Sequence, residues 1–335
     1  MTPTLQPFQK TIKLLASLQL TLGCLGFLML VVTACTLEQA SLGTFASVDK
    51  YFRSAFLYKT LGPLTLPVFP AGGAVGTVLL VNLLASFVTR FEWSRRKAGI
   101  FLTHAGLVIL VLGEFLTGIT AVESRLAFEE GQSVNFVESP RADELYVVDA
   151  SEGETDTVYA LGAASLRAGR SLSQADWPFS LSVREAYPNA ALGPRPPGLP
   201  ASLADQGAGR DLVVRGESSV SRDDARNLPA AFLEVREGGR SLGTWLVSAS
   251  LEEPQSFTAG GRSWQLGLRP ARRYLPFTLT LKDFRHDVYP GTNIPKNFSS
   301  QVRLTNAAKG EDRDVLIWMN NPLRYMGRTF YQASF

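Results

Sequence analysis

Long uncharged runs dominate the first third of the chain. No Asp, Glu, Lys or Arg occurs from Leu14 to Leu37 or from Thr60 to Thr89, and His104 is the one ionisable residue from Ala98 to Gly113. A helix needs about twenty apolar residues to cross a hydrocarbon core about 30 Å thick. The pattern therefore predicts three transmembrane helices, over residues 14–37, 70–89 and 99–122.

The periodicity changes from helical to alternating after Val122. Leu233 and Val235 alternate with charged residues, Gly238-Gly239 supplies a tight turn, and a second strand returns from Leu242 to Val247, which is typical of a β-hairpin. Similar alternation follows in three further groups: Phe277, Leu279 and Leu281; Val302 and Leu304; Val315, Ile317 and Met319. A segment rich in Pro, Gly and Ala, residues 188–210, is predicted to be a surface loop. The fold class is an α+β membrane protein, with three N-terminal transmembrane helices and a mainly antiparallel, sandwich-like β-domain over residues 123–335.

Positive charges in the short segments between spans predict the orientation. Lys10 and Lys13 lie in the N-terminal segment 1–13, and four basic residues lie in segment 90–98: Arg90, Arg95, Arg96 and Lys97. Because Lys and Arg concentrate on the cytoplasmic side, both segments are expected there. The loop 38–69 and the β-domain are then extracytoplasmic.

The loop 38–69 has a helical pattern of its own. Five residues recur at helical spacing and predict an amphipathic helix on the outer membrane surface: Val48, Tyr51, Phe52, Ala55 and Phe56. Three prolines, Pro63, Pro67 and Pro70, exclude a regular helix before the second span. Gly72 and Gly76 form a pair of small residues that suits close helix packing, against this chain's own spans or against a partner.

Charge and cysteine usage exclude some functions. The net charge is +3 with no basic cluster suited to phosphates, so no nucleic-acid partner is expected. The two cysteines, Cys24 and Cys35, both lie in the first span, so the β-domain has no disulfide. That span is longer than the apolar region of about 7–15 residues in a cleaved signal peptide. Val32 to Cys35 resembles a lipoprotein processing site, but two further spans already anchor the chain, which favours Cys35 as a small residue near a helix end.

Ionisable residues inside the third span are the main candidates for chemistry. The chain has no CxxC, HExxH, Gly-rich phosphate loop or nucleophile motif, so catalysis by this chain alone is not expected. His104 would lie roughly 7–8 Å inside the membrane, where a neutral imidazole suits axial ligation of haem iron or a hydrogen bond to a neighbouring helix. Glu114 is a weaker cofactor-binding candidate, with a protonated packing role favoured. His286, in a turn-rich stretch of the β-domain, is a further weak candidate for which a structural role is favoured.

Three segments carry a resemblance to a known family. Residues Ala98 to Pro140, Phe284 to Leu304 and Asn320 to Phe335 resemble the ResB/CcsB family of cytochrome c biogenesis proteins. The resemblance implies a membrane subunit of system II cytochrome c maturation, in the bacterial cytoplasmic (inner) membrane and in contact with membrane lipid. It implies a ResC/CcsA-type membrane partner, with which the subunit moves haem b outward and presents it to the CxxCH motifs of apocytochrome c. His104 occupies the position of the family's haem-ligating histidine in the third span.

The sequence departs from the family at its end, and a second function remains open. Family members carry a fourth span after the external domain, whereas this sequence stops at Phe335, so a fragment, a truncated product or a piece of a split or fused gene is expected. The alternative function is a membrane-anchored assembly protein whose β-domain binds a protein partner without a cofactor.

Overall fold

The computed structural model describes residues 5–62, 64–90, 94–151, 156–220 and 226–332. The chain forms two compact units. The helical unit comprises Met1–Val122 with Ser219–Arg226, and the β-unit comprises Glu123–Ser218 with Asn227–Phe335. The predicted fold class is confirmed, because apolar helices come first and a mainly antiparallel β-rich region follows.

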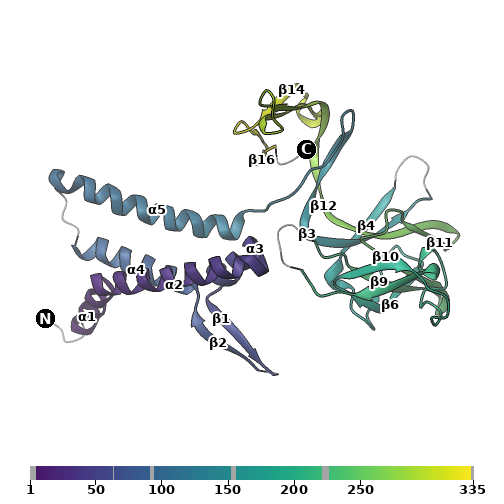
Figure 1. Cartoon of the computed structure of the whole chain (residues 1–335), viewed down its shortest axis with the longest axis horizontal. Helices are drawn as coiled ribbons and strands as arrows, with labels where there is room; N and C mark the ends of the chain where they lie inside the picture. The colour runs from purple at the N-terminus through teal and green to yellow at the C-terminus, as the bar shows by residue number, and fades with distance from the viewer. Residues whose placement is uncertain (1–4, 63, 91–93, 152–155, 221–225, 333–335) are drawn as a thin grey trace. The chain divides into compact units, whose positions relative to one another are not determined.

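Among the described residues, three helices are long and apolar enough to cross a membrane. They are α2 (Leu18–Leu42), α4 (Gly72–Arg90) and α5 (Ala98–Thr120), drawn in Figure 1. A separate helix, α1 (Leu5–Leu15), precedes them, and a 3-10 turn, η2 (Arg95–Lys97), precedes α5. Residues 1–4 of the predicted N-terminal segment and 91–93 of the predicted segment 90–98 lie outside the described residues.

A helix break shifts the first predicted span. Leu14 and Leu15 end α1, and α2 begins only at Leu18 and continues beyond the predicted end to Leu42. The Ser17 side chain accepts a hydrogen bond from the Leu20 amide at 3.2 Å, which is an N-cap and starts a new helix. Cys35 lies inside α2 and is 2% exposed.

The amphipathic helix predicted to extend to Phe56 is wrong at its C-terminal end. Two short helical pieces, α3 (Thr44–Val48) and η1 (Asp49–Arg53), are followed by a hairpin of β1 (Phe56–Leu61) and β2 (Leu64–Pro70). The chain turns extended at Ser54, and the Ala55 carbonyl accepts a hydrogen bond from the Ala71 amide at 2.9 Å. Pro67 fits in β2 because this strand pairs only with β1.

Two antiparallel sheets form the body of the β-unit. The first has the order β10-β9-β6-β5, and the second has the order β14-β13-β12-β3-β4 with β11 also paired to β12. The strand bounds of the first sheet are β5 Ser171–Leu172, β6 Phe179–Tyr187, β9 Ala230–Glu237 and β10 Arg240–Ser248. Those of the second are β3 Ser133–Asp149, β4 Thr157–Gly162, β11 Gln255–Ala259, β12 Arg262–Val288, β13 Pro295–Asn306 and β14 Glu311–Trp318.

Two large hydrophobic cores and one smaller cluster lie in the described part of this unit. The first core packs the two sheets face to face, as in a sandwich, and its fully buried side chains include Leu145, Leu181, Leu233 and Trp264. The smaller cluster contains Phe232 and Leu246. The second core contains Leu275, Phe277, Leu279, Val302 and Leu304, and it is closed by the small hairpin β15 (Leu323–Tyr325) and β16 (Arg328–Phe330).

The strand patterns predicted from the sequence agree with these cores. β9 and β10 form the predicted hairpin, whose turn residues Gly238 and Gly239 have φ of 54° and 86°, as a two-residue type I′ turn requires. Phe277, Leu279 and Leu281 are buried on one face of β12. Met319, however, was predicted to continue the strand and lies beyond it, because β14 ends at Trp318 and the backbone turns at Met319 with φ of 32°.

The predicted surface loop 188–210 is only partly a loop. Its first residues form β7 (Ala190–Pro194), which pairs with β8 (Leu212–Gly216) beyond the predicted end, and a 3-10 turn, η4 (Ala208–Asp211), leads into β8. The Pro- and Gly-rich pattern indicates turns correctly, but it does not reveal a strand pair formed across the loop.

Candidate functional site

His104 lies in the second turn of α5, where its side chain bonds to its own helix. The ring Nδ1 is 2.9 Å from the Ile100 carbonyl oxygen. A carbonyl oxygen only accepts hydrogen bonds, so this contact requires the proton on Nδ1. In a neutral ring the lone pair is then on Nε2, and the ring is held in one orientation, as second-shell bonds do for metal-binding histidines.

His104 lies on the partly buried face of α5, a helix whose other residues are mostly exposed. Within α5 the partly buried residues include Phe101, His104, Ala105 and Val108, which share a helix face, and the Phe101 ring lies 5.1 Å from that of Phe87 in α4. This face is therefore the one turned toward α4. None of the residues of α5 is fully buried, so His104 is accessible from the edge of the α4–α5 contact.

Glu114 does not join His104. The two residues are ten positions apart on α5, which corresponds to about 15 Å along the helix axis. Glu114 is exposed, and its position on the helix turns it to a different side. One iron could not be contacted by both side chains.

His286 belongs to the β-unit and lies in a regular strand. Its ring stacks on Phe298, its cross-strand partner in β13, with ring centroids 4.5 Å apart and an interplanar angle of 11°. The prediction that placed it in a turn-rich stretch is wrong, because β12 continues to Val288 and the turn follows at Tyr289. Asn297 also donates to the Asp287 carboxylate at 3.3 Å, so the neighbouring cross-strand pair is polar.

The donor set of the described residues is sparse. Within them, no three His, Cys, Asp or Glu side chains gather where they could hold a metal ion. His104 offers a single oriented nitrogen, and one imidazole supplies one axial position of a haem iron. His104 would therefore supply one ligand to a haem iron, and any second ligand would have to come from another residue.

Sequence reasoning missed a polar site inside the helical unit. Asn82 of α4 is 2% exposed, and its amide donates to the Ser17 carbonyl oxygen at 3.0 Å and to that of Leu15, while its oxygen accepts from the Thr21 hydroxyl at 2.6 Å. Ser86 adds a bond to the Ala16 carbonyl oxygen at 3.2 Å. The signal was available, because an asparagine within an apolar span is costly unless it has partners.

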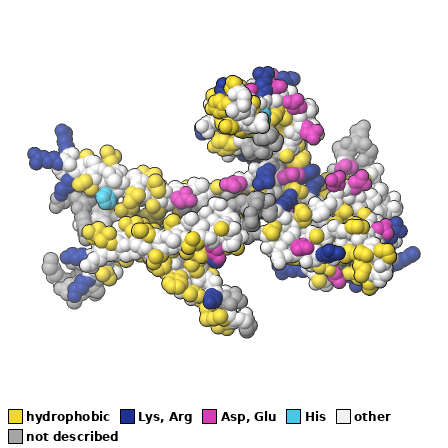
Figure 2. Space-filling model, in the orientation of Figure 1, with side chains coloured by type: hydrophobic (Ala, Val, Ile, Leu, Met, Phe, Trp, Pro, Cys, Tyr) yellow, Lys and Arg dark blue, Asp and Glu magenta, His cyan; other side chains and the backbone are white. Residues whose placement is uncertain are grey.

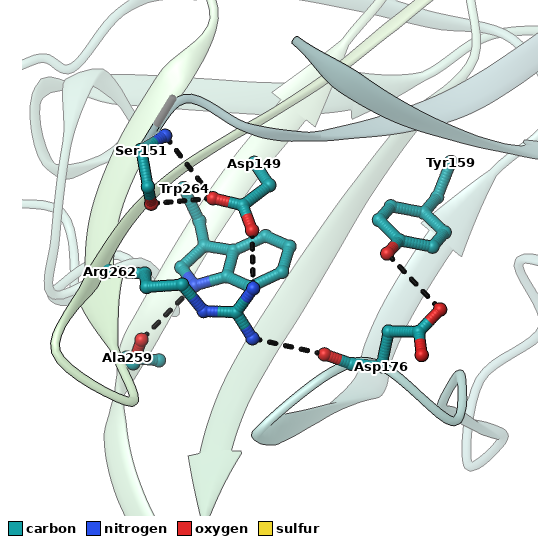
Figure 3. A network of polar contacts seen from close by, with 7 residues as sticks. All are labelled: Asp149, Ser151, Tyr159, Asp176, Ala259, Arg262 and Trp264. Carbon is teal, nitrogen blue, oxygen red and sulfur yellow. Dashed lines mark hydrogen bonds and ion pairs between the residues drawn. The ribbon is translucent and has the colours of Figure 1, made fainter. Parts of the chain in front are cut away.

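The β-unit holds a second polar network, shown in Figure 3. Arg262 donates to Asp149 at 2.5 Å and to the Asp176 carbonyl oxygen at 3.2 Å, and its guanidinium lies 4.8 Å from the Trp264 ring centre. Hydrogen bonds from Ser151, with the charge of Arg262, hold the pKa of Asp149 below its usual value despite the cost of desolvation. The polar groups of this network bond to one another at the end of the first core, so we assign the network a structural role.

Comparison with known proteins relates the chain to one family. The chain is 26% identical over 262 residues to Protein NrfI of Wolinella succinogenes, an alignment that covers 77% of this chain and 25% of that protein. The chain thus spans about a quarter of the length of the relative it matches. Residues 233–335 match the ResB-like family, a region that begins within β9 and continues through β16, and it contains most of the second core. The predicted resemblance is confirmed, and over residues 233–335 the chain is ResB-like in sequence.

Proposed function

We propose that the chain acts in cytochrome c biogenesis, as a membrane subunit of a system II maturation complex. In this role it helps a ResC/CcsA-type partner to move haem b outward and to present it to the CxxCH motifs of apocytochrome c. The ResB-like match and the similarity to NrfI support the biogenesis role. The observation that carries the haem step is the His104 Nδ1 contact with the Ile100 carbonyl oxygen, which leaves the lone pair of a neutral ring on Nε2.

The chain's own part in this step is to hold one imidazole in a fixed orientation. A neutral ring can be placed in a membrane at lower cost than a charged side chain. The acceptor is a backbone carbonyl oxygen of the same helix, so no side chain from another element is needed to orient the ring before haem binds. Haem iron would take this nitrogen as one axial ligand, and the other ligand would come from the partner.

The orientation of the helices is part of the proposal. Basic residues at Arg95, Arg96 and Lys97 directly precede α5, which favours the cytoplasm for this end. The β-unit would then lie outside the cytoplasm, where apocytochrome c receives haem. Reporter fusions after Arg96 should read cytoplasmic and fusions near Gly216 extracytoplasmic, and the reverse pattern would contradict the proposed route.

The test of the haem step is a ligand substitution in the complete complex. The full chain is co-expressed with a ResC/CcsA-type partner, purified in detergent, and its haem is measured from the Soret absorbance per complex. His104→Ala should lower the haem content and the yield of mature cytochrome c, because one axial ligand is lost. Imidazole added to the medium should restore part of both by filling the vacant position.

Thr103→Ala is the matched control. Thr103 is the exposed neighbour of His104, and its hydroxyl donates to the Gly99 carbonyl oxygen of the same helix at 3.0 Å. Its removal changes a polar group of α5 without changing the nitrogen ligand. Equal haem content in wild-type and His104→Ala complexes, at equal protein level, would contradict the haem step and favour the alternative of an assembly protein that binds a partner without a cofactor.

A further inference from the structure

The β1–β2 hairpin of the helical unit exposes an unusual amount of apolar surface. Figure 1 shows it leaving the α2–α4 pair at a steep angle, and Figure 2 shows hydrophobic side chains gathered over it. Its exposed large side chains are Phe56 (44%), Tyr58 (59%), Leu61 (58%), Leu64 (56%), Leu66 (42%), Val68 (51%) and Phe69 (57%). A water-soluble hairpin of this size would expose polar residues instead.

Both faces of the hairpin are apolar. The register pairs Phe56 with Pro70 and Tyr58 with Pro67 on one face, and it pairs Leu57 with Phe69 and Leu61 with Leu64 on the other. A sheet that docks on a protein has one face for the partner and one for water. Apolar side chains on both faces fit an environment that surrounds the hairpin, as lipid does.

The base of the hairpin is fixed at the first turn of α4. The Ala71 amide bonds to the Ala55 carbonyl oxygen at 2.9 Å, and the Phe69 ring lies 6.5 Å from that of Phe27 in α2. α4 has 19 residues, or about 28 Å, which matches a hydrocarbon core about 30 Å thick. The end of α4 that carries the hairpin is therefore at the boundary between acyl chains and headgroups.

Charge and backbone chemistry define the depth more closely. Among the described residues of the hairpin, Lys59 is the one charged side chain. Aromatic residues and a lysine among aliphatic side chains are typical of segments that lie in the membrane interface. Among the described strands, β1 and β2 pair only with each other. Hydrocarbon excludes backbone N–H and C=O groups at sheet edges, whereas the hydrated headgroup region accepts them.

We propose that the β1–β2 hairpin lies in the headgroup region of the bilayer and inserts its Leu and Phe side chains among the upper acyl chains. The hairpin then anchors the start of α4 laterally, in the plane of the membrane. This inference rests on α4 crossing the membrane, and it is independent of haem, so it can fail or hold whatever the outcome at His104.

The test measures where the hairpin tip lies in a bilayer. The full chain, as Leu61→Cys or separately as Leu66→Cys, is labelled with bimane and placed, one copy per disc, in nanodiscs of phosphatidylcholine and phosphatidylglycerol. Cys24 and Cys35 are buried, so background labelling is measured on the unsubstituted chain and subtracted. Quenching is recorded with doxyl groups high on the acyl chain, with doxyl groups at the chain end, and with aqueous iodide.

Ser256→Cys, at an exposed position of β11, is the matched control in the β-unit. Both hairpin labels should lose most of their emission to the high doxyl group, less to the chain-end group and little to iodide, whereas the Ser256→Cys label should respond to iodide. Iodide quenching of the hairpin labels equal to that of the control would overturn the proposal. Shielding of both hairpin labels from lipid and iodide alike would overturn it in favour of a protein contact.

Discussion

The Asn82 side chain of α4 bonds to the Ser17 carbonyl oxygen at 3.0 Å, at the break between α1 and α2. The same amide reaches Leu15, and Ser86 reaches Ala16, so three consecutive carbonyl oxygens of the break have side-chain donors from one helix. Carbonyl groups released by a helix break inside a membrane need such donors. Side chains of α4 therefore stabilise the break between α1 and α2.

Asn82→Leu should destabilise the helical unit by about 1–3 kcal/mol, because the Leu15 and Ser17 carbonyl oxygens lose the Asn82 amide as a donor. Unfolding by sodium dodecyl sulfate in mixed micelles, followed by circular dichroism, measures the loss. Thr89→Val is the control, since the Thr89 hydroxyl donates within α4, to the Ala85 carbonyl oxygen at 2.7 Å. Equal stability of the two variants would show that the Asn82 hydrogen bonds do not stabilise the helical unit.

Two glycines of α4 should respond to alanine with opposite signs. A Cβ on Gly73 would lie 2.6 Å from the Ser54 carbonyl oxygen, whereas a Cβ on Gly76 would meet nothing within 4 Å. Gly73→Ala should cost about 1–3 kcal/mol through this overlap, and Gly76→Ala should stabilise α4 by up to about 1 kcal/mol through helix propensity. The same micelle titration checks both, and a stabilised Gly73→Ala variant would contradict the close approach.

Two ion pairs between β3 and β12 should differ in strength. Glu144 is 6% exposed and pairs with Arg269 at 2.8 Å, while also accepting from the Arg272 amide at 3.2 Å. Its removal in Glu144→Ala leaves a nearly buried guanidinium unpaired, which should cost about 3–5 kcal/mol. Thermal unfolding followed by tryptophan fluorescence measures the change.

The control is Glu138→Ala. The Glu138 carboxylate lies 2.9 Å from Arg272 Nε, and each of the two side chains is 28% exposed. Solvent screens this pair, so its loss should cost about 1 kcal/mol or less. A cost for Glu138→Ala as large as that for Glu144→Ala would show that burial does not govern these pairs.

The lowered pKa of Asp149 predicts an acid-sensitive contribution to stability. Ser151 and Arg262 favour the charged carboxylate in the folded state, so its contribution is complete above the unfolded pKa of about 4 and is lost as pH falls through the lower folded value. The difference in unfolding free energy between wild type and Asp149→Asn should therefore shrink as the pH is lowered through this range.

The sequence predicted elements whose pattern is local. The turn at Gly238-Gly239 and the buried series Phe277, Leu279 and Leu281 agree with the structure, because alternation and positive-φ glycines are local requirements. The break at Ala16-Ser17 was not predicted, since Leu14 to Leu18 continues the apolar run and the donors come from α4. Tertiary partners of this kind leave no periodic signal.

The hairpin and the histidines show the same limit. Pro67 and Pro70 indicate that a helix is absent, but an isolated two-stranded sheet tolerates them. The Ala71 amide and the Ala55 carbonyl oxygen, which bond at the base of this sheet, are 16 residues apart, and no local pattern predicts their contact. For His104, residue type and depth predicted a candidate ligand. Its tautomer follows only from the distance to Ile100. The stacking of His286 on Phe298 depends on the register between β12 and β13, which could not be predicted from the sequence.

Strands β3 and β12 pass through both cores of the β-unit. Val137 packs in the second core and Leu145 in the first, and the same is true of Leu279 and Leu266 on β12. Unfolding of one core would displace strands that also pack in the other core. The two cores should thus melt in a single cooperative transition, and a ligand or partner that tightens one would slow hydrogen exchange at backbone amides of the other.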